Sequence, residues 1–338
     1  MKHLFIIHSH TPFLTAIGTI DLLKIESKDV VFFYSRGYKN DVIKHDFKVV
    51  ETTELTELCR TTMFTSRKNT KNALQMVDEL VEREVGEDYI LYAPHYIMPI
   101  CQALYTNKRC IKGAYIQEGG IPMRNLSITN LPKMKKLYYF LLNRVYRGTG
   151  RIWRPSAWYV EGSLKKQSVI ESYAISSSFF KSIPTHNNIV KWPQMPHGFK
   201  FNIKFPSTIF VLDGFITNGQ VEPDYYMQKC NDLIGLCGNK NQNYIKFHPA
   251  QPLQERNAII DMFKSKSLPI EEFSDSVPFE LVLTSTENLN IAGFGSSLLY
   301  FARDLGHQVT CKDEWLFNSP TYMEYKKRFN FDSFSESE

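Results

Sequence analysis

Short apolar runs recur along this chain, and most are followed by a turn and then by a segment with helical periodicity. In the first half the runs are residues 4–7, 30–34, 89–92 and 111–117, with helices expected at residues 13–24, 69–84 and 97–105. Continuous apolar runs are typical of parallel strands that are buried on both faces. The alternation therefore predicts a doubly wound α/β domain with functional groups at the carboxyl ends of its strands.

Local signals add detail to this first domain. Thr11 suits the N-cap of the first helix, and Pro12 suits its first helical position, where the missing N–H of proline has no intrahelical partner to lose. A returning strand is expected at residues 158–160.

The alternation starts again after residues 191–204, a segment with two prolines and one glycine that is the best candidate for a linker. Further strands are expected at residues 208–212, 243–247, 281–285, 289–292 and 308–310, with helices at residues 224–236, 253–264 and 296–305. Two Rossmann-like domains joined in this way are expected to face each other across a cleft, which is the usual place for a nucleotide-bearing ligand.

Composition excludes several classes of protein. With 338 residues and 43% hydrophobic content, the chain can build two ordinary cores and is not disordered. A net charge of +5 is too small to indicate nucleic acid as the main partner. The six cysteines lack zinc-site spacing, and no apolar stretch is long enough for a signal peptide or a membrane span. We therefore expect a cytoplasmic protein with reduced thiols.

A glycine-rich turn follows the run at residues 289–292. Glycines such as Gly295 let the backbone approach a ligand closely, and the start of the next helix presents free N–H groups that suit a phosphate. Ser296 and Ser297 add two hydroxyls at this point. The alternative is that Ser296 is only the N-cap of the helix.

A histidine followed by proline, His248 and Pro249, ends the run at residues 243–247. The proline favours an extended backbone at the histidine, whose imidazole can then donate a hydrogen bond to a phosphate or act as a general acid. The alternative is a structural histidine.

Two acidic residues also follow predicted strands. Glu118 stands beside glycines after residues 111–117, where a carboxylate can act as a general base. Asp213 ends the run at residues 208–212 and is the reserve candidate, although Asp-Gly is also a common turn.

The sequence contains few residues with the spacing of metal ligands. His8 and His10 would share one side of an extended backbone, but no third ligand stands near them, and two aspartates separated by one residue occur nowhere. We therefore expect neither a bound metal nor another cofactor.

Taken in order, Glu118-Gly119, His248-Pro249 and Ser296-Ser297 resemble the motifs of the bacterial sialyltransferases of GT-B fold. Those families share an acidic motif with glycine, a His-Pro motif and a pair of Ser or Thr residues. The likeness is closest to the lipooligosaccharide sialyltransferases and the polysialyltransferases. It covers most of the chain in architecture but only these few residues in motif.

The resemblance implies a role for each residue. Glu118 would deprotonate the acceptor hydroxyl, and His248 would bind or protonate the departing phosphate of CMP. Ser296 and Ser297 would hold that phosphate, and Glu280 matches the position of a carboxylate that binds the ribose hydroxyls. The residue before Glu118 is Gln117, where some relatives have a second acid, so Asp213 remains an alternative base.

The implied architecture has three parts: an N-terminal acceptor-binding domain (1–195), a C-terminal nucleotide-sugar-binding domain (205–312) and a helical tail (313–338) that can cross back onto the first domain. The implied activity is an inverting, metal-independent transfer of sialic acid from CMP-sialic acid to a sugar hydroxyl. A galactoside of a bacterial surface glycan, in lipopolysaccharide O-antigen or capsule, is the expected acceptor. The alternatives are a nucleotide-sugar epimerase of similar fold and a non-catalytic relative that binds glycans.

Residues 131–154 combine basic side chains with Leu, Tyr, Phe and Trp. This composition is typical of a helix in a lipid interface, where an anionic surface attracts each of Lys133, Lys135 and Lys136 by about 1 kcal/mol. The alternatives are a core helix with a solvated basic side and a patch for an anionic acceptor. Docking at the inner face of the cytoplasmic membrane would suit a lipid-linked acceptor.

Overall fold

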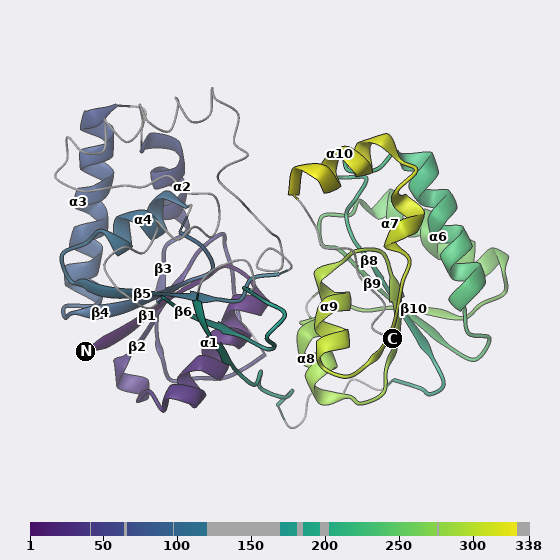
Figure 1. Cartoon of the computed structure of the whole chain (residues 1–338), viewed down its shortest axis with the longest axis horizontal. Helices are drawn as coiled ribbons and strands as arrows, with labels where there is room; N and C mark the ends of the chain where they lie inside the picture. The colour runs from purple at the N-terminus through teal and green to yellow at the C-terminus, as the bar shows by residue number, and fades with distance from the viewer. Residues whose placement is uncertain are drawn as a thin grey trace. The chain divides into compact units, whose positions relative to one another are not determined.

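The computed structural model describes residues 1–40, 42–63, 66–96, 98–119, 170–180, 185–196, 203–275 and 277–329. The chain forms two compact units, each built on its own parallel sheet (Figure 1). The first unit holds Met1–Glu118 and the described residues from Ile170 to Trp192, and the second holds Gly119 and the described residues from Pro193 onward. The predicted α/β class is confirmed.

The first unit contains a seven-stranded sheet in the order β3-β2-β1-β4-β5-β6-β7. Its strands are β1 (Lys2–Ile7), β2 (Val30–Tyr34), β3 (Lys48–Glu51), β4 (Tyr89–Ala93), β5 (Cys110–Ile116), β6 (Ile170–Ala174) and β7 (Thr185–Ile189). Helix α1 (His10–Leu23) covers one face of the sheet (Figure 1). The opposite face carries α2 (Thr53–Thr62), α3 (Arg67–Glu84) and α4 (Pro99–Tyr105), and a short 3-10 helix, η1 (Ser27–Asp29), precedes β2.

The second unit contains a five-stranded sheet in the order β10-β9-β8-β11-β12. Its strands are β8 (Thr208–Leu212), β9 (Asn243–Phe247), β10 (Ile270–Glu272), β11 (Asn290–Gly293) and β12 (Gln308–Cys311). Helices α6 (Pro223–Cys237) and α7 (Leu253–Ser265) lie on one face, with α8 (Phe279–Ser285) and α9 (Ser297–Asp304) on the other (Figure 1). The 3-10 helix η4 (Asp313–Leu316) and helix α10 (Pro320–Phe329) follow.

A cluster of buried side chains attaches α6 and α7 to the second sheet. The rings of Phe210 on β8 and Phe263 on α7 meet edge to face, with their centroids 5.0 Å apart. Leu316 and Tyr322 belong to the same cluster. The described part of the tail therefore packs on the second unit.

The structure corrects two sequence predictions. Residues 281–285, predicted as a strand, lie in helix α8, which follows Pro278. The consecutive apolar residues 281–283 are buried, and a short buried apolar run does not distinguish a helix from a strand in the sequence. Helix α1 begins at His10 with Ser9 as its N-cap, so Thr11 is not the cap, and Pro12 occupies the first turn, where it breaks no hydrogen bond.

The sequence analysis missed several elements of low apolar content: β3, α2, β6, β7 and β10. Strands β3, β7 and β10 are edge strands, whose outer sides face solvent and so need no continuous apolar run. The strand predicted at residues 158–160 and the basic segment at residues 131–154 lie outside the described residues. Within the described ranges, no helix has the length and apolar character needed to cross a bilayer.

Gly18 lies where α1 passes the backbone of Lys191. A Cβ at Gly18 would stand 2.4 Å from the carbonyl oxygen of Lys191, so a side chain there must displace the helix or the segment beside it. We expect Gly18→Ala to lower the free energy of unfolding by about 1–3 kcal/mol, measured by urea denaturation, because overpacking outweighs the gain in helix propensity.

Gly235→Ala is the matched control. On α6 the nearest atom to a Cβ at Gly235 is Lys266 Nζ at 3.8 Å, an ordinary contact. There the usual helix preference should hold and the free energy of unfolding should stay level or rise by up to ~1 kcal/mol. Equal effects of the two substitutions would contradict the tight packing at Gly18.

Candidate active site

Three polar side chains of the first unit meet at the carboxyl edge of its sheet: His8, His95 and Glu118. His8 directly follows β1, and the other two stand two residues after the ends of β4 and β5. These strands are parallel neighbours, so their carboxyl ends lie side by side. His8 Nε2 lies 2.8 Å from Glu118 Oε1, and His95 Nε2 lies 3.6 Å from Glu118 Oε2.

Burial shapes the charges of this cluster. It lowers the pKa of His95 to about 4, so the ring is neutral at pH 7. Burial also opposes ionisation of Glu118, but the His8 hydrogen bond and the electrostatic interactions with His95, His8 and Arg36 outweigh it and hold the pKa of Glu118 well below its usual range. Since His95 is neutral at pH 7, the permanent positive charge that lowers the pKa of Glu118 comes from Arg36. Glu118 is therefore an ionised carboxylate.

The ionised state of Glu118 assigns the hydrogen bond to His8. A carboxylate only accepts hydrogen bonds, so His8 Nε2 carries the proton and donates it, which leaves Nδ1 of a neutral ring as an acceptor. Within the described part of the chain, neither His8 Nδ1 nor Glu118 Oε2 has a hydrogen-bond partner. The His8–Glu118 pair can therefore take up a proton from a hydroxyl placed beside it.

A second group of side chains occupies the carboxyl edge of the other sheet: Asp213 after β8, His248 after β9 and Ser297 at the start of α9 after β11. Strands β9, β8 and β11 are neighbours in this sheet. His248 Nε2 lies 3.8 Å from Asp213 Oδ1, and the Gly214 N–H donates to the same oxygen at 2.8 Å. The structure thus brings the two residues together.

The backbone sets the orientation of His248. Its Nδ1 accepts a hydrogen bond from the Ala250 N–H at 3.1 Å, so a neutral ring carries its proton on Nε2, toward Asp213. The His248 N–H itself donates to Leu212 O and to Gln251 Oε1. With the side chain 43% exposed, Nε2–H is a positioned donor that a ligand can reach.

A cavity of about 230 Å³ lies beside Asp213. Gly295, Ser297, Asp313 and Tyr322 also line it. A Cβ at Gly295 would stand 2.8 Å from Asp313 Oδ1, so only glycine permits this close approach. Asp313 is itself neutralised, since it accepts hydrogen bonds from the Tyr322 hydroxyl and from Lys326 Nζ.

Of the other predicted site residues, Ser296, Glu280 and Pro249 do not line this cavity. Ser296 is the N-cap of α9, and Ser297, rather than Ser296, lines the cavity. Glu280 lies in the first turn of α8 and is not among the described residues that line this cavity; its charge acts on Lys246 instead. The carbonyl of Pro249 accepts a hydrogen bond from Arg256.

Sequence reasoning missed the partners of His8. His8 bonds Glu118, whereas His10 Nδ1 lies 3.2 Å from the Tyr38 hydroxyl, so the two histidines do not form a pair. His95 also escaped notice, although its place after a predicted strand was a usable signal. The described ranges contain no cluster of three or more His, Cys, Asp or Glu side chains suited to a metal ion.

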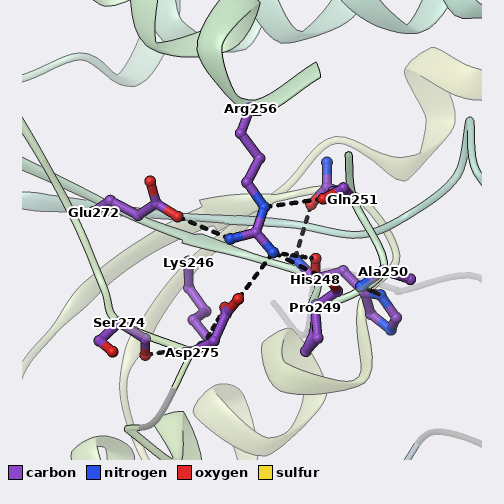
Figure 2. Close-up of polar contacts among 9 residues, drawn as sticks. All are labelled: Lys246, His248, Pro249, Ala250, Gln251, Arg256, Glu272, Ser274 and Asp275. Atoms are coloured by element: carbon purple, nitrogen blue, oxygen red, sulfur yellow. Dashed lines mark hydrogen bonds and ion pairs between the residues drawn. The ribbon is translucent and has the colours of Figure 1, made fainter. Parts of the chain in front are cut away.

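Arg256 holds the turn that carries His248 and Pro249 (Figure 2). From α7, its guanidinium donates to the carbonyls of Gln251, His248 and Pro249 at 3.1, 3.2 and 3.4 Å. It also pairs at 3.0 Å with the carboxylates of Glu272 and Asp275. One planar cation therefore satisfies three turn carbonyls and ties them to the last residue of β10 and to the segment after it.

Comparison with known proteins supports the fold. Neither a protein-family model nor a curated protein sequence matches this chain. Among solved structures, spinosyn rhamnosyltransferase SpnG is similar with a TM-score of 0.50 and 13% identity, over 97% of this chain and 84% of that one. The co-structure of S. aureus MnaA with UDP also has a TM-score of 0.50, at 10% identity over 97% and 87% of the two chains. The chain has the GT-B fold.

The buried His95 generates a prediction about pH. Its pKa is about 4 in the folded protein, against 6.5 for a free histidine, so between these values the unfolded chain binds more protons than the folded one. The contribution of the neutral His95 to the free energy of unfolding is fully present above pH 6.5 and is lost as the pH falls toward 4. Urea midpoints of the wild type should therefore drop more steeply over this window than those of His95→Gln.

His186→Gln is the control, because His186 is exposed on β7 and should leave the steep pH dependence of the wild type intact. Parallel pH profiles for the wild type and His95→Gln would show that His95 is not held neutral by burial.

Arg256 generates a prediction about stability. Lysine keeps the charge but cannot reach the carbonyls and both carboxylates at once. We expect Arg256→Lys to lower the free energy of unfolding by about 1–3 kcal/mol in urea denaturation. Arg303→Lys is the control, since Arg303 pairs with the adjacent Asp304 and should change stability by at most ~0.5 kcal/mol. A loss no larger than that of the control would contradict the role of Arg256 in the turn.

Proposed function

We propose that this chain is an inverting, metal-independent glycosyltransferase that moves sialic acid from CMP-sialic acid to a sugar hydroxyl. The observation that carries the proposal is the His8–Glu118 pair, an ionised carboxylate hydrogen-bonded at 2.8 Å to an imidazole at a sheet edge. The GT-B fold and the ordered motifs at Glu118, His248 and Ser297 support the same assignment.

In this proposal the first unit binds the acceptor. The acceptor oxygen attacks the anomeric carbon of the sialyl group while the bond from that carbon to the CMP phosphate oxygen breaks. The hydroxyl proton passes to the His8–Glu118 pair, and the electrons of the broken bond leave with CMP. A single displacement of this kind inverts the anomeric centre.

The second unit binds the donor. His248 Nε2–H, the Ser297 hydroxyl and the free N–H groups at the start of α9 are donors for a phosphate. A monophosphate leaving group carries less charge than a diphosphate, so such donors can stabilise it without a metal ion. Asp213, which faces His248, then serves to orient the imidazole, and Glu118 is preferred to it as the base.

The test is the substitution Glu118→Gln, which keeps the shape of the side chain but removes the proton acceptor. We expect transfer from CMP-sialic acid to lactose to fall by about 10²–10⁴-fold. CMP affinity, measured by calorimetry, should be unchanged, because the second unit binds the nucleotide.

Two further arms separate the alternatives. Glu79→Gln, on the exposed face of α3, should transfer at the wild-type rate. Assays with UDP-sugars, run with and without an acceptor, test whether the chain uses a different nucleotide and whether it has epimerase activity, since MnaA was solved with UDP. Transfer within a few-fold of wild type in Glu118→Gln would remove Glu118 as the base, and absence of CMP-sialic acid turnover in the wild type would refute the donor.

A further inference from the structure

Arg36 is an exposed arginine in the turn after β2. Among the described residues, no carboxylate lies within ion-pair distance of its guanidinium, whose one side-chain contact is Nη2 to Met98 Sδ at 3.4 Å. A thioether sulfur is a weak acceptor, so among the residues that the structure describes most of the five donors of this arginine have no hydrogen-bond partner. This contrasts with Arg256, which is fully engaged.

The contact with Met98 directs Arg36 toward the sheet edge that holds the candidate base. Strand β1 lies between β2 and β4 in the sheet, and Met98 stands just before α4 in the segment after β4. A side chain that reaches from the end of β2 to Met98 must cross the carboxyl end of β1, where His8 stands. The charge of Arg36 accordingly acts on both His95 and Glu118.

The backbone of Arg36 is strained. Its φ of 57° lies in the left-handed region, which disfavours a residue with a Cβ by about 1 kcal/mol. The turn is held by other groups: the Tyr38 N–H donates to Ser35 O, and the Gly37 N–H donates to Thr53 Oγ1. Glycine would adopt this left-handed conformation at no steric cost, so the fold itself does not require arginine here.

We propose that Arg36 binds the carboxylate of an acidic sugar beside the His8–Glu118 pair. The planar fork of a guanidinium matches a carboxylate with two parallel hydrogen bonds. Such a cation is needed at this site, because the ionised Glu118 would otherwise repel a second carboxylate. The inference rests on the proposed function and names the substrate class of the same site. The carboxylate comes either from the donor sugar or from an acidic sugar in the acceptor.

The experiment compares matched acidic and neutral ligands on the full chain by calorimetry. The pairs are CMP-sialic acid against CMP, sialyllactose against lactose, and UDP-glucuronate against UDP-glucose. We expect the wild type to prefer the acidic member of at least one pair. Arg36→Met should reduce that preference by about 10–100-fold, and Arg36→Lys by less. The pair that responds identifies the source of the carboxylate.

Two variants control for structure. Arg60→Met removes an exposed arginine of α2 that pairs with Glu57, and it should keep the wild-type preference. Arg36→Gly relieves the left-handed strain, so it should match or exceed the wild-type melting temperature while losing the preference for the acidic ligand. A purely structural arginine would lower the melting temperature instead.

The remaining outcomes also decide the matter. No acid preference in the wild type, or the same preference in Arg36→Met, overturns the proposal. Equal losses for both members of a pair would place Arg36 on the phosphate or the nucleotide and overturn it as well. A wild type that ignores CMP ligands but prefers UDP-glucuronate through Arg36 would refute CMP-sialic acid as the donor while the carboxylate site stands.

Discussion

The order of strands in the two sheets is the constraint on which the candidate site depends. Each sheet has its earliest strand in its interior, with β1 between β2 and β4, and β8 between β9 and β11. The chain therefore crosses over in opposite directions from that strand, and the connections diverge at its carboxyl end. His8 with His95, and Asp213 with Ser297, stand at these two points of divergence, and the cavity of the second unit lies beside Asp213 and Ser297.

Glu118 and Asp313, the two buried carboxylates of the described residues, are paired in different ways. Asp313 is neutralised by Lys326 and the Tyr322 hydroxyl, which stabilises the packing of the tail on the second unit. Glu118 is also buried, but its hydrogen-bond partner is an imidazole, and one of its oxygens has no such partner in the described structure. A buried ion with incomplete pairing is costly to keep, so its retention at a sheet edge is better explained by chemistry than by stability.

The sequence analysis located the strands well where burial dictates composition. Strands β2 and β8 and residues 4–7 of β1 are buried, and nearly all of their residues are apolar. Strand β9 is buried as well, although it carries Asn243 and Lys246. Edge strands β3 and β7 face solvent on one side and carry polar residues, and α8 is apolar enough to resemble a strand. Local patterns therefore do not identify an edge strand that carries polar residues, and they do not distinguish a short apolar helix from a strand.

Glu118, Asp213, His248 and Ser297 could be found from the sequence because each follows a predicted strand, and carboxyl ends of parallel strands share one edge of a sheet. What the sequence could not determine is which of them meet. The contacts of His8 with Glu118, 110 residues away, and of Arg36 with Met98, 62 residues away, depend on strand order. Strand order is set by pairing between distant segments, which no local pattern records. The sequence by itself determined the strand ends and the chemistry placed on them, and only the tertiary structure decided their partners.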